Sequence, residues 1–496
     1  MPPVPLLGPV LTLGTLSALA GLDPSILEPP DEIEIASTEV RFVESRHAET
    51  VVRGRPWVPF RRMATIARGT RLAVRGQVES RDAKGCNGKP WYAVWPFGYV
   101  CSQDVRATKT PPLVGETLGV EEGQRLPHSY AVVRDDGVPS YSNAENARLG
   151  VVDRPLAKSM SLVVNRTLEI DGMRYVETQS GKLVPKDSVG WMGQGSAFSG
   201  VHLEVDEPGP FFGWARTEGT KVRREPSKDA EVVGKLPLRQ RVPLLERSSG
   251  QRAWWRVGED AWVDAEDLNE VHVLAPPEGV LTELRTSSTG NDQWIDVDVG
   301  EQVLVAYRGD RPVFATLVSS GRGSPTPLGN YPVWAKVASM DMANQDYEDR
   351  PYMVQGVPWV LLFQGHNALH GAYWHDKFGN RKSHGCVNLA PADARWVFEW
   401  AGPSMPPGWT GYLPPDLHRS IVVHVRDSSR EPGSEFTQQR AWGPPDREEE
   451  QRKLEAAEQR RAALAEAEGR ADPSEPEAPR TGQPSRLEAT PPPLVD

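Results

Sequence analysis

One segment of the chain, residues 366–394, concentrates residue types that support thiol chemistry: HNALHGAYWHDKFGNRKSHGCVNLAPADA. A cysteine nucleophile needs a base for its proton, hydrogen-bond donors for an oxyanion, and an exposed place on a turn. Cys386 follows His384 and Gly385, and glycine permits a tight bend with open backbone amides. His370 follows a buried apolar run and can fold back onto the thiol. We therefore predict that Cys386 is a nucleophile activated by a neighbouring histidine.

Two other interpretations of this segment are weaker. A lone cysteine is usually a small buried apolar residue, but here histidines and glycines surround it. A zinc-dependent peptidase is the other alternative, but no Glu lies between His366 and His370, and Gly371 disfavours the helix of the usual zinc motif. No metal and no other cofactor is therefore expected. A zinc site would be drawn from His366, His370, Asp376, His384 and Cys386.

The same segment closely resembles the signature of L,D-transpeptidases, in which His-Gly is followed by Ser/Thr-His-Gly-Cys. The stretches WIDVDVGEQVLVAY, SSGRGSPTPLGNYPV and PADARWVF also fit, so the resemblance covers about residues 280–425. It implies a β-sandwich-like domain that attacks the bond after the meso-diaminopimelate residue of a tetrapeptide stem. A thioester forms, and an amine of another stem or of a protein lysine resolves it. The matching residues are His370, Gly371, Ser383, His384, Gly385, Cys386, Val387 and Asn388.

The resemblance also implies a role for each catalytic residue. Cys386 is expected to be the nucleophile and His370 its base. Ser383 and His384 are expected to support the site, and Gly385 and the Cys386 N–H to stabilise the oxyanion. The resemblance further implies that carbapenems acylate the cysteine.

The residues expected to contact the substrate are less specific. Asn388 stands where some members of the family have arginine, which leaves open how it helps to hold the substrate carboxylate. Arg381 and Lys382 are expected to attract an acidic stem. The predicted substrate-binding residues are Asn388, Gly371, Tyr352, Tyr373 and Trp374. Three histidines without motif support are expected to be structural or surface residues: His366, His375 and His424.

Short β-type runs surround the motif and predict that strands position it. WIDVDVGEQVLVAY alternates about a Gly300-Glu301 turn, which predicts a hairpin with one buried face. VPWVLLFQG reads as a buried strand, and SIVVHV as a final strand. APADARWVFEWA predicts one helix with Pro391 near its first turn. We therefore assign residues 280–426 to the catalytic domain.

Upstream stretches repeat one layout, in which two short strands precede a Trp-containing strand, a turn and a further strand. They resemble bacterial SH3-like domains, small barrels that often accompany cell-wall enzymes. The resemblance is good over 213–270, fair over 41–108 and weak over 129–192, which is assigned as a degenerate copy. The whole chain is thus predicted to be mainly β and multi-domain. Four aromatic residues have two possible roles in these modules: Trp91, Trp95, Trp255 and Trp262. They either fill the barrel cores or form a groove for wall polymers, and we favour the core role because small barrels need bulky side chains.

The two ends of the chain differ from the rest. Residues 1–22 are mostly apolar and contain Ala-Leu-Ala, which favours a signal peptide. A signal peptide normally also has Lys or Arg among its first residues, and here none occurs before Arg41. The alternative is an apolar terminus without that function. Residues 427–496 predict a charged helix followed by a Pro-rich disordered tail. Cys86 and Cys101 are expected to pair in an oxidising compartment, or else the cysteines are unrelated thiols.

These features predict a peptidoglycan L,D-transpeptidase in the periplasm or cell envelope, which makes 3-3 cross-links or attaches a protein to the wall. The net charge of -11 and mixed charges give no basic footprint for nucleic acid, and Pro and Gly near the N-terminus disfavour a stable membrane span. Expected partners are peptide stems and an envelope protein as acyl acceptor. One alternative is a carboxypeptidase or endopeptidase that uses water on the same stems. Another is a non-catalytic wall-binding protein.

The modules before about Glu270 are predicted to hold the enzyme on its polymer without taking part in the chemistry. The Pro276-Pro277 step looks like a linker, where a domain boundary is expected. On this hypothesis, a chain that starts near Val271 keeps its rate on soluble stems.

Overall fold

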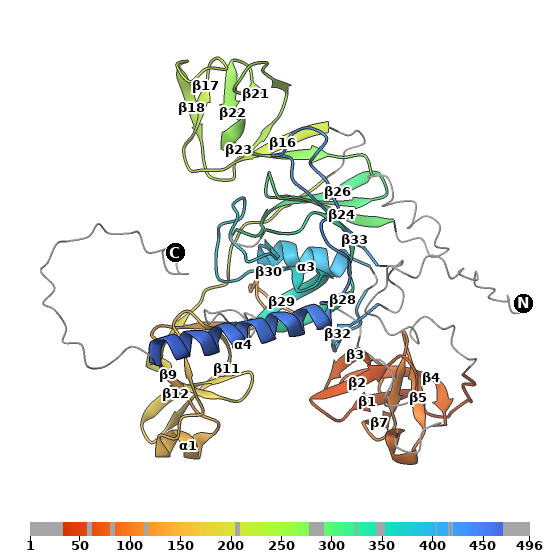
Figure 1. Ribbon diagram of the computed structural model, residues 1–496. Coiled ribbons are helices and arrows are strands. Elements are labelled where there is room, and N and C mark those ends of the chain that lie inside the picture. Colours follow the sequence, from red (N-terminus) through yellow and green to blue (C-terminus); the bar gives the residue numbers. More distant parts are fainter. Residues whose placement is uncertain are drawn as a thin grey trace, which may run out of the picture.

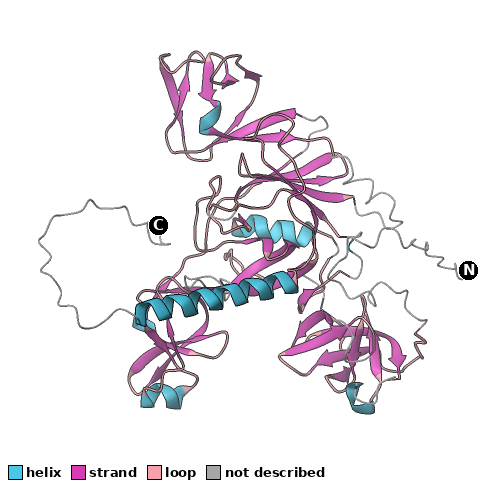
Figure 2. Ribbon diagram, viewed as in Figure 1, coloured by secondary structure: helices cyan, strands magenta, loops and turns pink. Residues whose placement is uncertain are grey.

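The computed structural model is built mainly of strands, which confirms the predicted fold class (Figures 1 and 2). The signal peptide predicted over residues 1–22 and the Pro-rich tail after residue 470 lie outside the described residues. The structure describes residues 33–56, 62–79, 85–113, 118–203, 209–276, 292–322, 325–343, 353–402, 404–414, 417 and 420–469.

The first module is a small antiparallel β assembly. Its strands are β1 (Phe42–Ser45), β2 (Glu49–Arg53), β3 (Arg62–Ala67), β4 (Arg71–Val78), β5 (Trp91–Val94), β6 (Tyr99–Cys101) and β7 (Val105–Thr108). Strand β1 pairs with both β4 and β7, which brings the two ends of the module together. Cys86 and Cys101 form a disulfide, and both pack beside the buried Trp91.

The middle module contains one short helix besides its strands. Its elements are β8 (Ser129–Val133), β9 (Val138–Ser140), α1 (Ala144–Leu149), β10 (Arg154–Leu156), β11 (Ser161–Ile170), β12 (Met173–Thr178), β13 (Leu183–Pro185) and β14 (Val189–Trp191). Helix α1, which we did not predict, begins at Asn143, whose side chain accepts from the Asn146 N–H. It ends at Gly150, whose φ of 67° suits glycine.

The third module consists of two small sheets. After β15 (Val201–His202), its strands are β16 (Gly209–Ala215), β17 (Thr220–Arg223), β18 (Val232–Leu236), β19 (Arg241–Pro243), β20 (Glu246–Arg247), β21 (Trp254–Gly258), β22 (Ala261–Asp264) and β23 (Leu268–Val273). Trp255 is buried in its core, whereas Trp262 is only partly buried and Trp95 of the first module is exposed. Core packing, the favoured role, therefore holds for Trp91 and Trp255.

The C-terminal domain holds the largest core. Its elements are β24 (Gln293–Asp298), β25 (Val303–Arg308), β26 (Arg311–Ser319), β27 (Gly329–Pro332), β28 (Ala335–Ala343), β29 (Met353–Gln364), β30 (Asn367–Gly371), β31 (Val387–Leu389), α3 (Pro391–Trp400), β32 (Trp409–Tyr412) and β33 (Val422–Arg426). The predicted hairpin is present as β24 and β25, and the predicted helix begins at Pro391. The expectation that only one face of the hairpin is buried is wrong, because consecutive residues along both strands are buried. Strand β33 pairs in parallel with β24, so the end of the domain lies beside its start.

All three modules share strand pairing or core with this domain. Strand β3 pairs with β32, β11 meets β29 at Ser161 and Val354, and β15 pairs with β26. Trp214 and Val271 of the third module lie in one buried cluster with Trp294. The linker predicted near residue 276 continues outside the described residues, and β23, which precedes it, carries apolar side chains into the C-terminal core.

The segment after β33 folds back along the C-terminal domain. It ends in the charged helix that was predicted, α4 (Arg447–Gly469). The Gly365 N–H donates to the Gly443 carbonyl at 2.9 Å. Glu450 in the first turn of α4 lies 3.5 Å from His366 Nε2. Helix α4 therefore runs beside the turn between β29 and β30 (Figure 1).

Candidate active site

Two neighbouring strands bring the predicted nucleophile and base into one region of the sheet. Strands β30 and β31 are parallel, and His370 is paired with Asn388. Cys386 lies in the turn directly before β31, so it enters the sheet beside the strand that carries His370.

Cys386 is a partly buried free thiol in the turn directly before β31. Its Sγ lies 3.7 Å from the His366 carbonyl, and among the described residues it makes no hydrogen bond to His370. Burial raises the pKa of this thiol to about 11, although the Ala368 backbone N–H opposes the rise. The resting group is therefore a thiol, and it needs a base during attack.

His370 is buried and its ring orientation suits a base. Nδ1 lies 3.2 Å from the Gly371 carbonyl, to which an Nδ1–H group donates. The neutral ring then has an unprotonated Nε2 that can accept a proton. Burial lowers the pKa of His370 to about 4, against a smaller rise from that backbone bond. The Trp374 ring stacks on the imidazole with centroids 5.8 Å apart.

Two hydroxyl groups fix the turn that presents Cys386. Ser383 Oγ donates to the Cys386 carbonyl and accepts from the Gly385 N–H at 3.2 Å. Thr326 Oγ1 donates to the Gly385 carbonyl at 2.8 Å and accepts from the Gly321 N–H at 3.0 Å. Gly385 has φ of 137°, a conformation that favours glycine. Of the two predicted oxyanion donors, the Gly385 amide is thus engaged within the turn.

Asn388 and His375 form a buried pair beside His370. The Asn388 side-chain amide lies 2.9 Å from His375 Nε2, and the Lys377 N–H donates to His375 Nδ1 at 3.2 Å. Burial, with a contribution from Lys382, lowers the pKa of His375 to about 3, so its ring is neutral. A neutral ring that accepts at Nδ1 donates from Nε2, which assigns the amide oxygen of Asn388 to the side facing His375.

Two family models match parts of the chain. Residues 292–412 match the YkuD model, described as the L,D-transpeptidase catalytic domain, and residues 218–269 match the bacterial SH3 domain. The chain carries an L,D-transpeptidase catalytic domain. YciB of Bacillus subtilis (strain 168), named as a candidate L,D-transpeptidase, is 28% identical over 120 residues, which are 21% of this chain. The chain spans 59% of the length of that curated relative.

Solved L,D-transpeptidase structures are similar to part of the chain. The Mycobacterium smegmatis enzyme is 19% identical with a TM-score of 0.22, covering 27% of this chain and 58% of its own. The catalytic domain of the Enterococcus faecium enzyme is 22% identical with a TM-score of 0.22, covering 28% of this chain and 99% of its own.

The residues predicted to bind substrate lie in different places around the L,D-transpeptidase site. Trp374 is partly buried against His370, whereas Tyr373 is buried, with its hydroxyl donating to the Gln355 carbonyl at 2.6 Å. Asn388 is buried against His375, as described above. Gly371 is tightly packed, because a Cβ there would lie 3.1 Å from Pro358 Cγ. Tyr352 lies outside the described residues.

Several polar residues near the site have surroundings that the sequence did not predict. His384 is exposed on the turn, and Arg381 lies 3.7 Å from the Asp427 carboxylate. His375 was expected to be a structural or surface residue, and it is buried beside the site, whereas Thr326 was not predicted to support the site. Neither carries a signal in its spacing, because each acts through a partner that only folding brings close.

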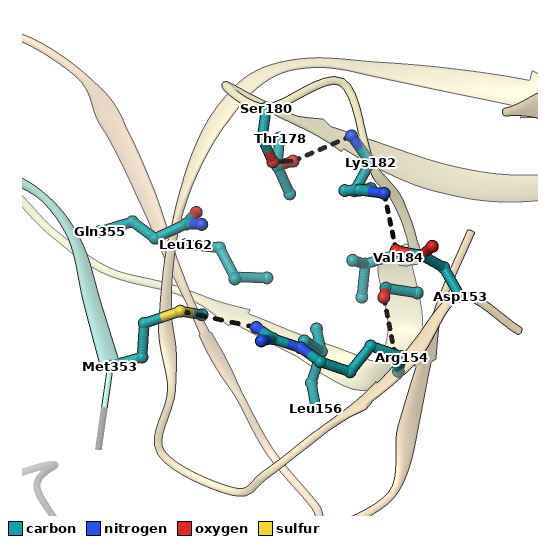
Figure 3. Close-up of a pocket in the computed structure, with 11 residues that line it drawn as sticks. Asp153, Arg154, Leu156, Leu162, Thr178, Ser180, Lys182, Val184, Met353 and Gln355 are labelled. Atoms are coloured by element: carbon teal, nitrogen blue, oxygen red, sulfur yellow. Dashed lines mark hydrogen bonds and ion pairs between the residues drawn. The ribbon is translucent and has the colours of Figure 1, made fainter. Parts of the chain in front are cut away.

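A separate pocket of about 280 Å³ lies between the middle module and β29 (Figure 3). Leu156, Leu162 and Val184 give it an apolar side, and Lys182 is paired with Asp153 at its rim. Neither Cys386 nor His370 lines this pocket, so it is separate from the candidate active site.

Two further features bear on the setting of the domain. In the described part of the chain, no group of three or more His, Cys, Asp or Glu side chains is arranged to hold a metal ion. None of the described helices is both long and apolar enough to cross a bilayer.

Proposed function

We propose that the protein is a peptidoglycan L,D-transpeptidase that uses Cys386 to transfer the acyl group of a tetrapeptide stem to an amine. The observation that supports this proposal is the parallel pairing of β30, which carries His370, with β31, which Cys386 directly precedes. Both residues belong to the segment that matches the L,D-transpeptidase catalytic domain.

The chemistry follows from the protonation states of the two groups. His370 Nε2 accepts the Sγ proton as Sγ attacks the carbonyl carbon of the third stem residue. The Cys386 N–H donates to the developing oxyanion. Collapse of the tetrahedral intermediate breaks the peptide bond, and the imidazolium returns its proton to the leaving amine. A second amine then attacks the thioester, loses a proton to His370 and releases the thiol.

We also propose that the protein works in the cell envelope. Peptidoglycan lies outside the cytoplasm, and the disulfide between Cys86 and Cys101 suits an oxidising compartment. Peptide stems are the proposed acyl donors, and a second stem or an envelope protein is the proposed acceptor.

Product analysis tests the proposal. The purified full chain is incubated with disaccharide-tetrapeptides, and the products are separated and weighed by mass spectrometry. We expect 3-3 linked dimers, absent with Cys386→Ala. Tripeptide stems alone would instead make water the acceptor and the protein a carboxypeptidase. Stems left unchanged by a folded chain would leave a wall-binding protein without catalysis.

A further inference from the structure

An arginine of the third module reaches the loop that joins β30 to the catalytic turn. Arg239 lies between β18 and β19, and its Nη1 is 2.7 Å from Asp376 Oδ1. Its Nη2 donates to the Asp376 carbonyl, also at 2.7 Å. Ser196 Oγ donates to the same carboxylate at 2.5 Å. The guanidinium group therefore bonds to both the side chain and the backbone of Asp376.

The arginine is held in place on its own side of the contact. Its side chain is 12% exposed, and its guanidinium carbon lies 5.0 Å from the centre of the Phe198 ring. Its backbone has φ of 61°, an uncommon conformation for a residue other than glycine. The Arg239 N–H donates to the Ala215 carbonyl at 2.8 Å, which supports this conformation. Such strain persists only where the surroundings determine it, and it often marks a functional position.

A second residue of the same module holds the same loop. Asn269 is buried, and its Nδ2 donates to the Gly379 carbonyl at 3.0 Å and to the Glu301 carbonyl at 2.6 Å. A Cβ on Gly379 would lie 2.9 Å from Asn269 Oδ1, so the Asn269 side chain packs against the Gly379 backbone in space that only glycine leaves open. The loop is thus fixed from the third module at two points.

The loop held in this way carries the groups that surround the proposed base. Trp374 stacks on His370, and His375 hydrogen bonds to Asn388, which is paired with His370 across the strands. Asp376 directly follows His375. A displacement of Asp376 therefore moves the two rings that pack against His370 and its neighbour.

We infer that Arg239 is a positioning residue for the active site, through which the third module fixes the Trp374–Asp376 loop against His370. This inference rests on the proposed function of Cys386 and His370. The carboxylate of Asp376 is about half exposed, so the ion pair alone contributes little to stability. Its effect is expected on the geometry of the site, where a displacement of about 1 Å can cost a hundredfold in rate.

The test compares Arg239→Ala with Arg239→Lys and with Arg256→Ala in the full chain. Arg256 pairs with Glu246 inside the same module, which makes it a matched control. We expect Arg239→Ala to lower the rate constant of acylation at least tenfold, with KM changed less than about twofold. Lysine keeps the positive charge but cannot donate to both oxygen atoms at once, so Arg239→Lys should recover only part of the rate. Arg256→Ala should behave as wild type.

A pH profile separates positioning from general loss of structure. Loosening the loop admits water to His370, so the acid limb of the acylation rate should move from about pH 4 toward 6.5. Circular dichroism checks that each variant is folded. If Arg239→Ala does not fold, Asp376→Asn replaces it with the same expectation. A folded variant with the wild-type rate and profile would overturn the inference.

Alkylation distinguishes this inference from the proposed reaction. If wild type transfers no stem, the pH profile of iodoacetamide labelling at Cys386 is measured instead. A profile that shifts in Arg239→Ala but not in Arg256→Ala supports the positioning role without transpeptidation. Unshifted profiles in both variants overturn it.

Discussion

At the residue scale, burial drives the two proposed catalytic groups toward their neutral forms. It raises the pKa of Cys386 to about 11 and lowers the pKa of His370 to about 4. Between these values the pair is thiol and imidazole, and not thiolate and imidazolium. The proton therefore moves during attack on the substrate, and a reactive thiolate is not exposed beforehand.

This predicts slow alkylation of the resting enzyme. Because the thiolate fraction falls as the pKa rises, the iodoacetamide rate at pH 7 should be about two orders of magnitude below that of a free cysteine. The rate should climb with pH to about 11. Labelling followed by mass spectrometry gives the profile, with Cys386→Ala as the unlabelled control. An apparent pKa below 7 would show a preformed ion pair.

At the element scale, the sequence predicted the strands but not how they meet. Alternation around Gly300 predicted the hairpin of β24 and β25, and Pro391 marked the start of α3. The parallel pairing of β30 with β31 was not predictable, because a long loop separates them and periodicity does not encode partners. The role of Thr326 was hidden for the same reason, since it lies in a Pro/Gly loop far from Cys386 in sequence.

Removing the Thr326 hydroxyl should loosen the catalytic turn. Thr326→Val keeps the shape but leaves the buried Gly321 N–H and Gly385 carbonyl without this partner. We expect a loss of about 1–3 kcal/mol in the free energy of unfolding, together with slower acylation. Thr326→Ser keeps the hydroxyl and should stay near wild type. Urea unfolding measures the stability, and equal midpoints for the two variants would contradict this role.

At the scale of the whole molecule, the modules form part of the enzyme's structure. The sequence suggested separate units on a linker, since module boundaries follow local layout. Folding instead places Trp214 and Val271 in the same cluster as Trp294 and Tyr307. The first and middle modules join the C-terminal domain through β3 and β11. The catalytic strands are thus supported from several sides.

A buried valine of the third module tests this shared core. Val271 is fully buried in the cluster that contains Trp294, whereas Val232 of the same module is 41% exposed. Val271→Ala should lower the free energy of unfolding by about 2 kcal/mol through lost contacts and a cavity. Val232→Ala should change it little.

A chain that starts at residue 292 should bind the dye ANS and unfold without cooperativity, and wild-type acylation by that chain would refute the shared core.

The most direct test of the account is the mass of the intact protein after reaction with a carbapenem or a tetrapeptide stem. We predict a single adduct on Cys386, absent in Cys386→Ala. His370→Ala should form it at least about a hundredfold more slowly, as expected for loss of a general base. An adduct that persists in folded Cys386→Ala, or that forms at the wild-type rate in His370→Ala, would contradict the assignment of nucleophile and base.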